Sequence, residues 1–318
     1  MKAELLNKIE HEIQGQPFIG KPQNLYDPLN YIIALGGKRI RPILALMGCE
    51  LYSGNSDKAI PAAMAVEVFH NFSLIHDDIM DQAPLRRGSP SVHKKWDTNT
   101  AILSGDLMLV KAYGMLQKSE HKHWPELFAV FTKTAAEVCE GQQLDMNFET
   151  QALVSEADYL EMIRLKTSVL LGCSLQLGAI VADSPVEEAH KIYDLGVNMG
   201  MGFQLMDDYL DTFGTPELVG KQPGGDILAH KKTILVIKGM EAEHEKFKLL
   251  FENKTIEPND KIATAKKLFV STGADIYLKQ LSAKYFDLAL QGLSNLKVEE
   301  SKKTDLQEVL VYLQNRSY

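Results

Sequence analysis

The sequence has few of the features that mark secreted, membrane-spanning or repetitive proteins. Only three cysteines occur in 318 residues, Cys49, Cys139 and Cys173, and none belongs to a CxxC pair. Isolated cysteines in odd number argue against a disulfide framework and favour reduced thiols. The longest apolar stretch, residues 169–182, contains Ser, Gln and Gly and is too short to span a bilayer. The first 14 residues lack the apolar segment of a signal peptide, so we expect a cytoplasmic protein.

Acidic residues outnumber basic residues over the chain as a whole. The 34 Lys and Arg residues stand against 42 Asp and Glu, which gives a formal net charge of -8. Such a chain has no overall attraction to nucleic acid, which we therefore exclude as a partner. An anionic ligand would need basic residues concentrated locally.

Strand-like alternation, low-complexity linkers and repeats of fixed period are nearly absent. Apolar residues instead recur at helical spacing over much of the chain. The clearest segments are residues 62–76, 99–116, 127–144, 159–181, 186–210 and 274–296. Several of them are apolar nearly all round, which is typical of central helices covered by others. The sequence predicts an all-α bundle in a single domain over residues 1–318.

Two clusters of aspartates follow long apolar segments. The clusters are Asp77-Asp78-Ile79-Met80-Asp81 and Asp207-Asp208-Tyr209-Leu210-Asp211. Residues four apart share a helix face, so the first and last Asp of each cluster lie together and repel. One such cluster alone is more often a solvated helix end, but two copies favour a bound cation. Ligands that are all oxygen favour Mg²⁺, which we expect at Asp77, Asp78, Asp81, Asp207 and Asp211.

Basic residues accompany both clusters. Lys38, Arg39 and Arg41 follow a Gly36-Gly37 turn, Arg86 and Arg87 follow the first cluster, and Lys221 and Lys231 follow the second. Arg suits bidentate phosphate binding and Lys supplies a compact charge. Each alone could be a surface charge, but beside the Asp clusters they predict a site for a phosphorylated ligand. Residues 220–225 lack the spacing of a P-loop, which excludes a nucleotide hydrolase.

An ordered set of motifs gives the chain a specific resemblance. In order they are GGKRIRP, HNFSLIHDDIMD, RRG, SGDLML, GQQLD, Lys166-Thr167, FQLMDDYLD and GKQPGGD with KKT, between about residues 36 and 233. This set resembles the trans-prenyl diphosphate synthases, the polyprenyl synthetase family. Gln222 and Pro223 stand in swapped order relative to the commoner family pattern, and His230 stands where many members have Gly. Neither departure falls on a predicted metal ligand.

The resemblance implies a role for each matching residue. Asp77 and Asp81 would hold two Mg²⁺ ions and Asp207 another, about three per site. The allylic diphosphate would contact Arg86, Lys166 and Lys231. The second diphosphate would contact Lys38, Arg41, His70 and Arg87. Thr167 and Gln204 would face the cationic carbon, Gln142 and Asp145 would support the metals, and Lys221 would close over the site.

The implied fold is an isoprenoid-synthase-type helical bundle around a deep apolar cavity, usually a homodimer. The implied reaction condenses isopentenyl diphosphate with dimethylallyl, geranyl or farnesyl diphosphate to a short all-trans product. Bulky residues before the first Asp cluster form the cavity floor in the family. Phe72, with the small Ser73 beside it and Phe69 one turn earlier, resembles geranylgeranyl (C20) synthases, with farnesyl (C15) the next choice. On an ideal helix Phe72 lies about 140° from Asp77, so it can block a cavity only beside the helix.

Three other classes of protein share some of these features. A class I terpene cyclase shares one Asp cluster but needs no second diphosphate site, whereas this chain has GGKRIR and RRG. Head-to-head condensing enzymes also carry two Asp-rich motifs, but the GGKRIRP segment argues against them. A non-catalytic regulatory subunit should lack metal ligands, and both clusters are complete here.

Overall fold

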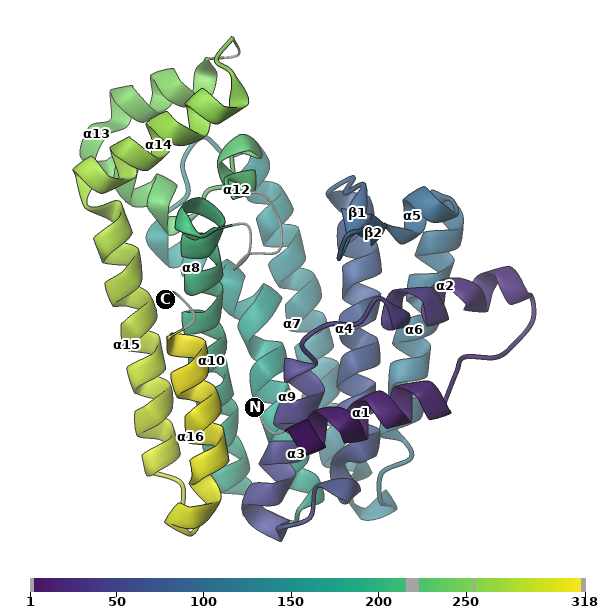
Figure 1. Cartoon of the computed structure of the whole chain (residues 1–318). Coiled ribbons are helices and arrows are strands. Elements are labelled where there is room, and N and C mark those ends of the chain that lie inside the picture. Colours follow the sequence, from purple (N-terminus) through teal and green to yellow (C-terminus); the bar gives the residue numbers. More distant parts are fainter. Residues whose placement is uncertain (1–2, 216–222, 254, 316–318) are drawn as a thin grey trace. The chain divides into compact units, whose positions relative to one another are not determined.

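Helices make up most of the structure, a computed structural model that describes residues 3–215, 223–253 and 255–315 (Figure 1). The longer helices are α1 (Ala3–Gly15), α2 (Gln23–Ala34), α3 (Ile40–Ser53), α4 (Ile60–Met80), α6 (Thr98–Leu116), α7 (Trp124–Thr150), α8 (Glu156–Ile163), α9 (Val169–Val181), α10 (Val186–Phe213), α13 (Ile234–Glu252), α14 (Pro258–Thr272), α15 (Ala274–Ser294) and α16 (Glu300–Gln314). The short elements are η1 (Ser56–Ala59), β1 (Leu85–Arg86), β2 (Ser89–Pro90), α5 (Val92–Lys95), η2 (His121–His123), η3 (Arg164–Ser168) and α12 (Gly225–Leu228). The predicted all-α class is confirmed.

The helical segments predicted from periodicity fall in helices, except that 274–296 extends two residues beyond the end of α15 and one segment is interrupted. The segment 186–210 lies within α10, and 99–116 coincides with α6 to within one residue. The segment 159–181 is divided, because the π-helical turn η3 separates α8 from α9. Apolar spacing cannot reveal such a turn, since a single wider turn shifts the pattern by only one residue.

The chain forms two compact units that interleave along the sequence. Unit 1 comprises the described residues of 1–134, 170–193 and 296–306, and unit 2 those of 135–169, 194–295 and 307–318. The single domain over residues 1–318 stays a prediction.

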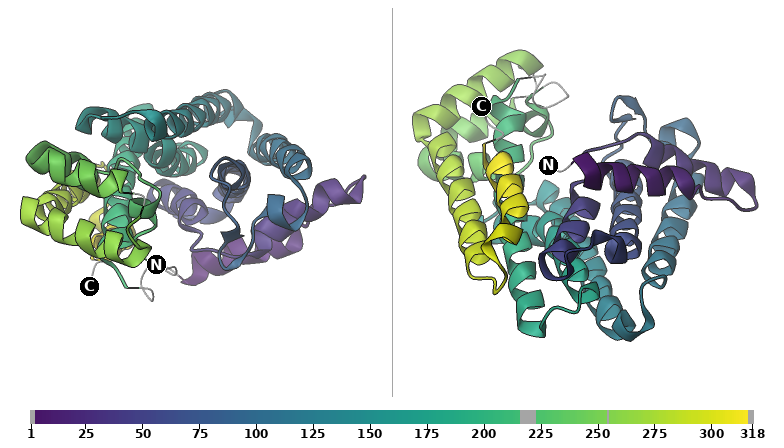
Figure 2. Two further views of the ribbon diagram at one scale, coloured as in Figure 1. Left: turned by 90° about the horizontal axis from the view of Figure 1, so that it is seen from above. Right: turned by 60° about the horizontal axis from the view of Figure 1, so that its bottom comes forward.

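Helix α4 is the central element of unit 1 and packs against α3 and α6 (Figures 1 and 2). Every residue from Ala62 to Phe69 is buried, which explains why this helix is apolar nearly all round. Glu67 is the charged exception, and its carboxylate is paired with the buried Arg39. The apolar run of α4 therefore fixes the position of the Asp cluster at its end.

Unit 2 has its core among α13, α14 and α15, which pack against one another. Phe247, Phe269 and Leu278, one from each of these helices, are fully buried in this core. Helix α10 is tied to α15 because the Ser282 hydroxyl donates to the Gly202 carbonyl at 2.8 Å. None of the described helices combines the length and apolar character needed to cross a bilayer.

Candidate active site

The first Asp cluster lies at the C-terminal end of α4. Asp77 and Asp78 occupy its last turn, and Asp81 caps the helix. The side chain of Asp77 is 20% exposed and that of Asp78 only 1% exposed, whereas Asp81 is exposed. The C-terminal end of a helix disfavours negative charge, so three carboxylates there require nearby cations.

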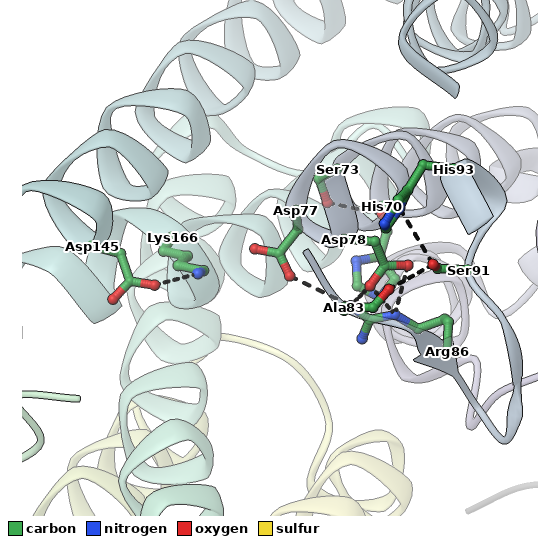
Figure 3. Close-up of polar contacts among 10 residues, drawn as sticks. All are labelled: His70, Ser73, Asp77, Asp78, Ala83, Arg86, Ser91, His93, Asp145 and Lys166. Carbon is green, nitrogen blue, oxygen red and sulfur yellow. Dashed lines mark hydrogen bonds and ion pairs between the residues drawn. The ribbon is translucent and has the colours of Figure 1, made fainter. Parts of the chain in front are cut away.

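Arg86 is the cation that the structure brings to this cluster. Its guanidinium contacts Asp78 through Nη2 at 2.5 Å and Nε at 3.0 Å, and it lies 3.5 Å from Asp77 (Figure 3). Burial raises the pKa of Asp78, although the Arg86 hydrogen bond opposes the rise. Burial would lower the pKa of Arg86, but the bond to Asp78 and the charges of the cluster outweigh it and raise the pKa. We regard the pair as ionised because both its contacts are short and directional.

A hairpin turn places the two arginines of RRG. Arg86 on β1 pairs with Ser89 on β2, and both intervening residues have positive φ, 53° at Arg87 and 77° at Gly88. These values are typical of a two-residue hairpin loop of type I′. The Arg87 guanidinium donates to the carbonyl of Gly36. The structure thus brings Arg87 into contact with the GGKRIRP segment, with which it shares a predicted role.

Arg39 links that segment to other helices of unit 1. It is buried, with its guanidinium 2.5 Å from Glu67 and 2.9 Å from Glu10, and it also donates to the Ile33 carbonyl at 2.8 Å. Its neighbour Lys38 is exposed. The basic residues of this segment therefore differ in role. Arg39 is buried and structural, whereas Lys38 is exposed.

Arg41 and His70 form a pair beside this segment. Nη1 of Arg41 lies 3.2 Å from Nε2 of His70. Burial lowers the pKa of His70 well below its usual value, and the charges of Arg41 and Arg87 lower it further. Because Arg41 can only donate, Nε2 of the neutral ring is the acceptor and its proton lies on Nδ1. Four predicted ligands of the second diphosphate, Lys38, Arg41, His70 and Arg87, are thus held within unit 1.

The predicted chain-length residues lie in an aromatic cluster upstream of Asp77. Phe72 and Phe69 are both buried, with ring centroids 5.4 Å apart. Phe72 also packs edge-on against His76 at 4.9 Å, and Phe69 against Phe131 of α7 at 5.5 Å. Ser73 donates to the His70 carbonyl within α4 at 2.8 Å. Phe72 therefore belongs to a buried aromatic cluster just before the carboxylate end of α4, and its role in product length stays a prediction.

In unit 2, Lys166 and Thr167 lie on the π-helical turn η3. Two glycines allow neighbouring helices to approach this turn. A Cβ at Gly141 of α7 would lie 2.2 Å from the backbone nitrogen of Lys166, and one at Gly200 of α10 would lie 2.6 Å from the Cα of Ser168. π-helical turns are frequent at functional sites because they redirect side chains out of the regular helix. Here the turn places a cation and a hydroxyl next to each other.

Lys166 and Asp145 form an ion pair between η3 and α7. Nζ of Lys166 lies 2.6 Å from Oδ2 of Asp145 (Figure 3). Asp145 was expected to support a metal and Lys166 to bind a phosphate, and the structure brings them into direct contact. Gln142, on the same helix, is half-buried.

A hydrogen-bonded chain continues from Thr167. Its hydroxyl donates to Oε1 of Gln204 at 3.1 Å, and Nε2 of Gln204 donates to Oδ1 of Asp208 at 3.0 Å. The Tyr159 hydroxyl donates to Oδ2 of Asp208. Burial and the Asp226 carboxylate raise the pKa of Asp208 to about 8, while both donors oppose the rise. Burial and the Asp208 charge raise the pKa of Tyr159 well above its usual value.

The second Asp cluster lies in the last two turns of α10. Asp207 is half-buried, and Asp211 is buried with Oδ2 accepting from the Asp226 N–H at 2.9 Å. Lys231 is half-buried and its N–H donates to the Asp226 carbonyl at 2.9 Å. Asp211 therefore ties α10 to the segment that carries Lys231. Lys221 lies outside the described residues.

Within the described parts of the chain, no group of three or more His, Cys, Asp or Glu residues is gathered as a ready-made metal site. The two Asp clusters belong to different units, and the role of each predicted residue stays a prediction. Residue patterns missed the contributions of Arg39, Tyr159, Asp208, Gly141 and Gly200. A charged Glu67 within an apolar helix was the one signal that could have pointed to Arg39.

Comparison with known proteins supports the resemblance over the whole chain. The sequence model of the polyprenyl synthetase family matches residues 22–270. A geranylgeranyl diphosphate synthase from Methanosarcina mazei is 37% identical over 302 residues, covering 94% of this chain and 92% of its own. A geranylfarnesyl diphosphate synthase from Aeropyrum pernix is 34% identical over 298 residues, covering 91% and 93%.

Solved structures agree in fold. A crystal structure of a geranylgeranyl pyrophosphate synthase superposes with a TM-score of 0.96 at 44% identity and covers 100% of both chains. A geranylgeranyl pyrophosphate synthetase from Pyrococcus horikoshii gives a TM-score of 0.90 at 32% identity and covers 98% of this chain and 96% of its own. The all-helical isoprenoid-synthase fold and its Asp-rich helix ends define a prenyltransferase of the short-chain prenyl diphosphate synthase class. The chain belongs to the polyprenyl synthetase family.

Proposed function

We propose that this prenyltransferase uses Mg²⁺ to join isopentenyl diphosphate to an allylic diphosphate, and that its end product is geranylgeranyl diphosphate. The observation that carries the proposal is the position of both Asp clusters at the C-terminal ends of long apolar helices, α4 and α10. Helix dipoles make these places unfavourable for uncompensated carboxylates. A bound cation removes that penalty.

The donors suit Mg²⁺. Asp77, Asp81 and Asp207 are accessible to different degrees and offer only oxygen, which Mg²⁺ prefers, and Mg²⁺ commonly completes its shell with substrate phosphates and water. We propose these three as direct ligands. Asp78 and Asp211 were also predicted as ligands; in the structure one pairs with Arg86 and the other accepts from a backbone N–H.

The reaction follows from the charges around the two diphosphates. Mg²⁺ held by these aspartates would neutralise the charge of the leaving diphosphate. Arg86, Lys166 and Lys231 bind the same group and stabilise the negative charge that develops as the allylic C–O bond breaks. Thr167 and Gln204 present oxygen dipoles to the allylic carbon as it becomes positive.

The second substrate is held by the basic set of unit 1. Lys38, Arg41 and Arg87 bind its diphosphate, and the neutral His70 donates from Nδ1. The double bond of isopentenyl diphosphate forms the new C–C bond, and the proton that it loses passes to the released diphosphate. The apolar helices exclude water, which would otherwise quench the cation.

Calorimetric titration with inorganic diphosphate tests the metal assignment. We expect binding in excess MgCl₂ and at least roughly tenfold weaker binding with EDTA. Asp77→Asn and Asp207→Asn should each weaken the Mg²⁺-dependent binding, while Asp106→Asn, an exposed Asp on α6, should not. Equal binding with and without Mg²⁺, or wild-type binding by both Asp variants, would refute the assignment.

Product length is proposed from the cluster around Phe72. Its buried ring would close the cavity beside α4, and Phe69 lies behind it. Relatives of similar identity carry names for both C20 and C25 products, so the family alone does not set the length. A single aromatic residue five positions before Asp77 favours C20, with C15 the next choice.

We also propose a homodimer in the cytoplasm. Ile102, Leu103 and Val110 are exposed apolar residues on α6, which supports burial against a second copy, and Cys49, Cys139 and Cys173 are free thiols. Light scattering should give the mass of a dimer, and Leu103→Glu combined with Val110→Glu should give a monomer. Val186→Glu, at an equally exposed apolar residue on α10, is the matched control and should stay dimeric. A monomeric wild type would overturn the dimer.

A further inference from the structure

Two residues that have no role in the proposed reaction, Asp208 and Tyr159, support the side chain of Gln204. Its Nε2 donates to Oδ1 of Asp208 at 3.0 Å, and the other oxygen of Asp208 accepts from the Tyr159 hydroxyl. Tyr159 is 3% exposed and Asp208 5% exposed, so the arrangement is shielded from water. Three elements contribute to this chain of bonds: α8, η3 and α10.

The chemistry of these groups sets the direction of the Gln204 amide. An amide can turn over and exchange its oxygen and nitrogen ends, but Oδ1 of Asp208 serves as the acceptor for Gln204, because Oδ2 is the oxygen bound to the Tyr159 hydroxyl. Asp208 therefore selects the orientation in which the nitrogen faces it. The amide oxygen must then point the opposite way, and the structure places it 3.1 Å from the Thr167 hydroxyl.

Tyr159 completes the arrangement by fixing the carboxylate. Asp208 lies one helical turn after Gln204 on the same face of α10, so the two side chains meet without strain. With one oxygen bound to Gln204 and the other to Tyr159, the plane of the carboxylate cannot rotate freely. Hydrogen bonds that are shielded from water in this way are stronger than those in solvent.

We propose that Tyr159 and Asp208 are positioning residues that hold the oxygen of Gln204 toward the allylic carbon as it becomes positive. This inference rests on the proposed function, which places Thr167 and Gln204 at that carbon. It assigns Asp208, the second Asp of its cluster, a role other than metal binding. Partners that orient an active group typically change its performance by roughly 10–100-fold.

A double-mutant cycle tests the proposal, with the single-turnover rate as its readout. Tyr159→Phe should slow the wild-type enzyme at least roughly tenfold with little change in the KM of either substrate. In a Gln204→Ala background the same change should have less than about twofold effect, because the oriented group is gone. Tyr277→Phe is the matched control, since that hydroxyl also donates to a carboxylate, Glu156 at 2.7 Å, in the same unit. It should leave the rate within about twofold of wild type.

Asp208→Asn, which keeps the shape of the side chain, is the second variant and covers the case that Tyr159→Phe unfolds the protein. It replaces one carboxyl oxygen by an NH₂ group, which cannot accept a hydrogen bond, so it should also slow turnover, and again only where Gln204 is present. Equal slowing in both backgrounds, or none in the wild-type background, would overturn the positioning role. A wild-type chain without Mg²⁺-dependent condensation would instead overturn the proposed function, and this inference with it.

Discussion

His70 lies among arginines and is held in its neutral form. Arg41 faces it directly, and Arg87, Arg86 and Arg39 add positive charge around it. Because its pKa is lowered in the folded protein, the unfolded chain gains a proton below about pH 6.5 that the folded protein does not. Folding stability should therefore fall as the pH is lowered through this range, and should be unaffected above it.

This behaviour gives a measurable difference. Between pH 6.5 and 5.5 the wild type should lose about 1 kcal/mol of unfolding free energy that His70→Gln does not lose. Urea unfolding at each pH measures it. The exposed His244→Gln variant is the matched control and should follow the wild-type profile. Identical profiles for wild type and His70→Gln would show that His70 is not held neutral.

Phe72 should set product length from its place beside the end of α4. Phe72→Ala removes a buried ring and opens space toward Phe69, so we expect products at least one isoprene unit longer, at a cost of about 3 kcal/mol in stability. Chromatography of the dephosphorylated alcohols measures the length. Phe247→Ala removes the same volume from the core of unit 2 and should lower stability without changing the product. An unchanged product from Phe72→Ala would remove Phe72 from the cavity floor.

Residue types in order along the chain predicted the charged motifs of the candidate site but not the residues that support them. The basic and acidic motifs could be named because their charge and spacing are visible in the sequence. The partners of Arg39 could not, since Glu10 and Glu67 are distant in sequence and only folding brings them together. The role of Tyr159 could not be predicted either, because a tyrosine on an apolar helix face is usually a core residue.

At the scale of elements, the turn η3 depends on close helix contact. Gly141→Ala would place a Cβ 2.2 Å from the backbone of Lys166, so the turn or α7 must move. We expect a loss of about 2 kcal/mol in stability. A displacement approaching 1 Å would lower kcat by more than roughly tenfold.

The matched control is Gly292→Ala, also in a helix of unit 2, where the nearest atom to the new Cβ is 3.4 Å away. That variant should keep full activity. Thermal unfolding measures the stability of both proteins, and steady-state kinetics measures their kcat. Wild-type kcat in Gly141→Ala would mean that the geometry of η3 does not govern Lys166 and Thr167.

Helices were the part of the fold that the sequence predicted well. Apolar residues at helical spacing placed α6 and α10 to within a few residues, because buried faces dictate that spacing. The π-helical turn and the hairpin of Arg86 and Arg87 were not predicted, since both arise from local backbone geometry and not from periodicity. These two irregular elements carry four of the predicted ligand-binding residues.

At the scale of the whole molecule, each unit holds one Asp cluster and one set of basic residues. Family membership rests on similarity over most of the chain, with the family model spanning residues 22–270 and a relative covering 94% of the sequence. The ordered motifs predicted that membership, because eight short patterns in one order are far more specific than any one alone. The division into two interleaved units was not predicted, since no linker marks it in the sequence.

The most direct test is a turnover assay on the purified chain alone. The chain receives isopentenyl diphosphate with dimethylallyl, geranyl or farnesyl diphosphate, with MgCl₂ or with EDTA, and the products are dephosphorylated and separated by length. We predict linear C20 alcohol from every primer with Mg²⁺ and no product with EDTA. Cyclic hydrocarbons formed without isopentenyl diphosphate, or no product from any primer, would contradict it.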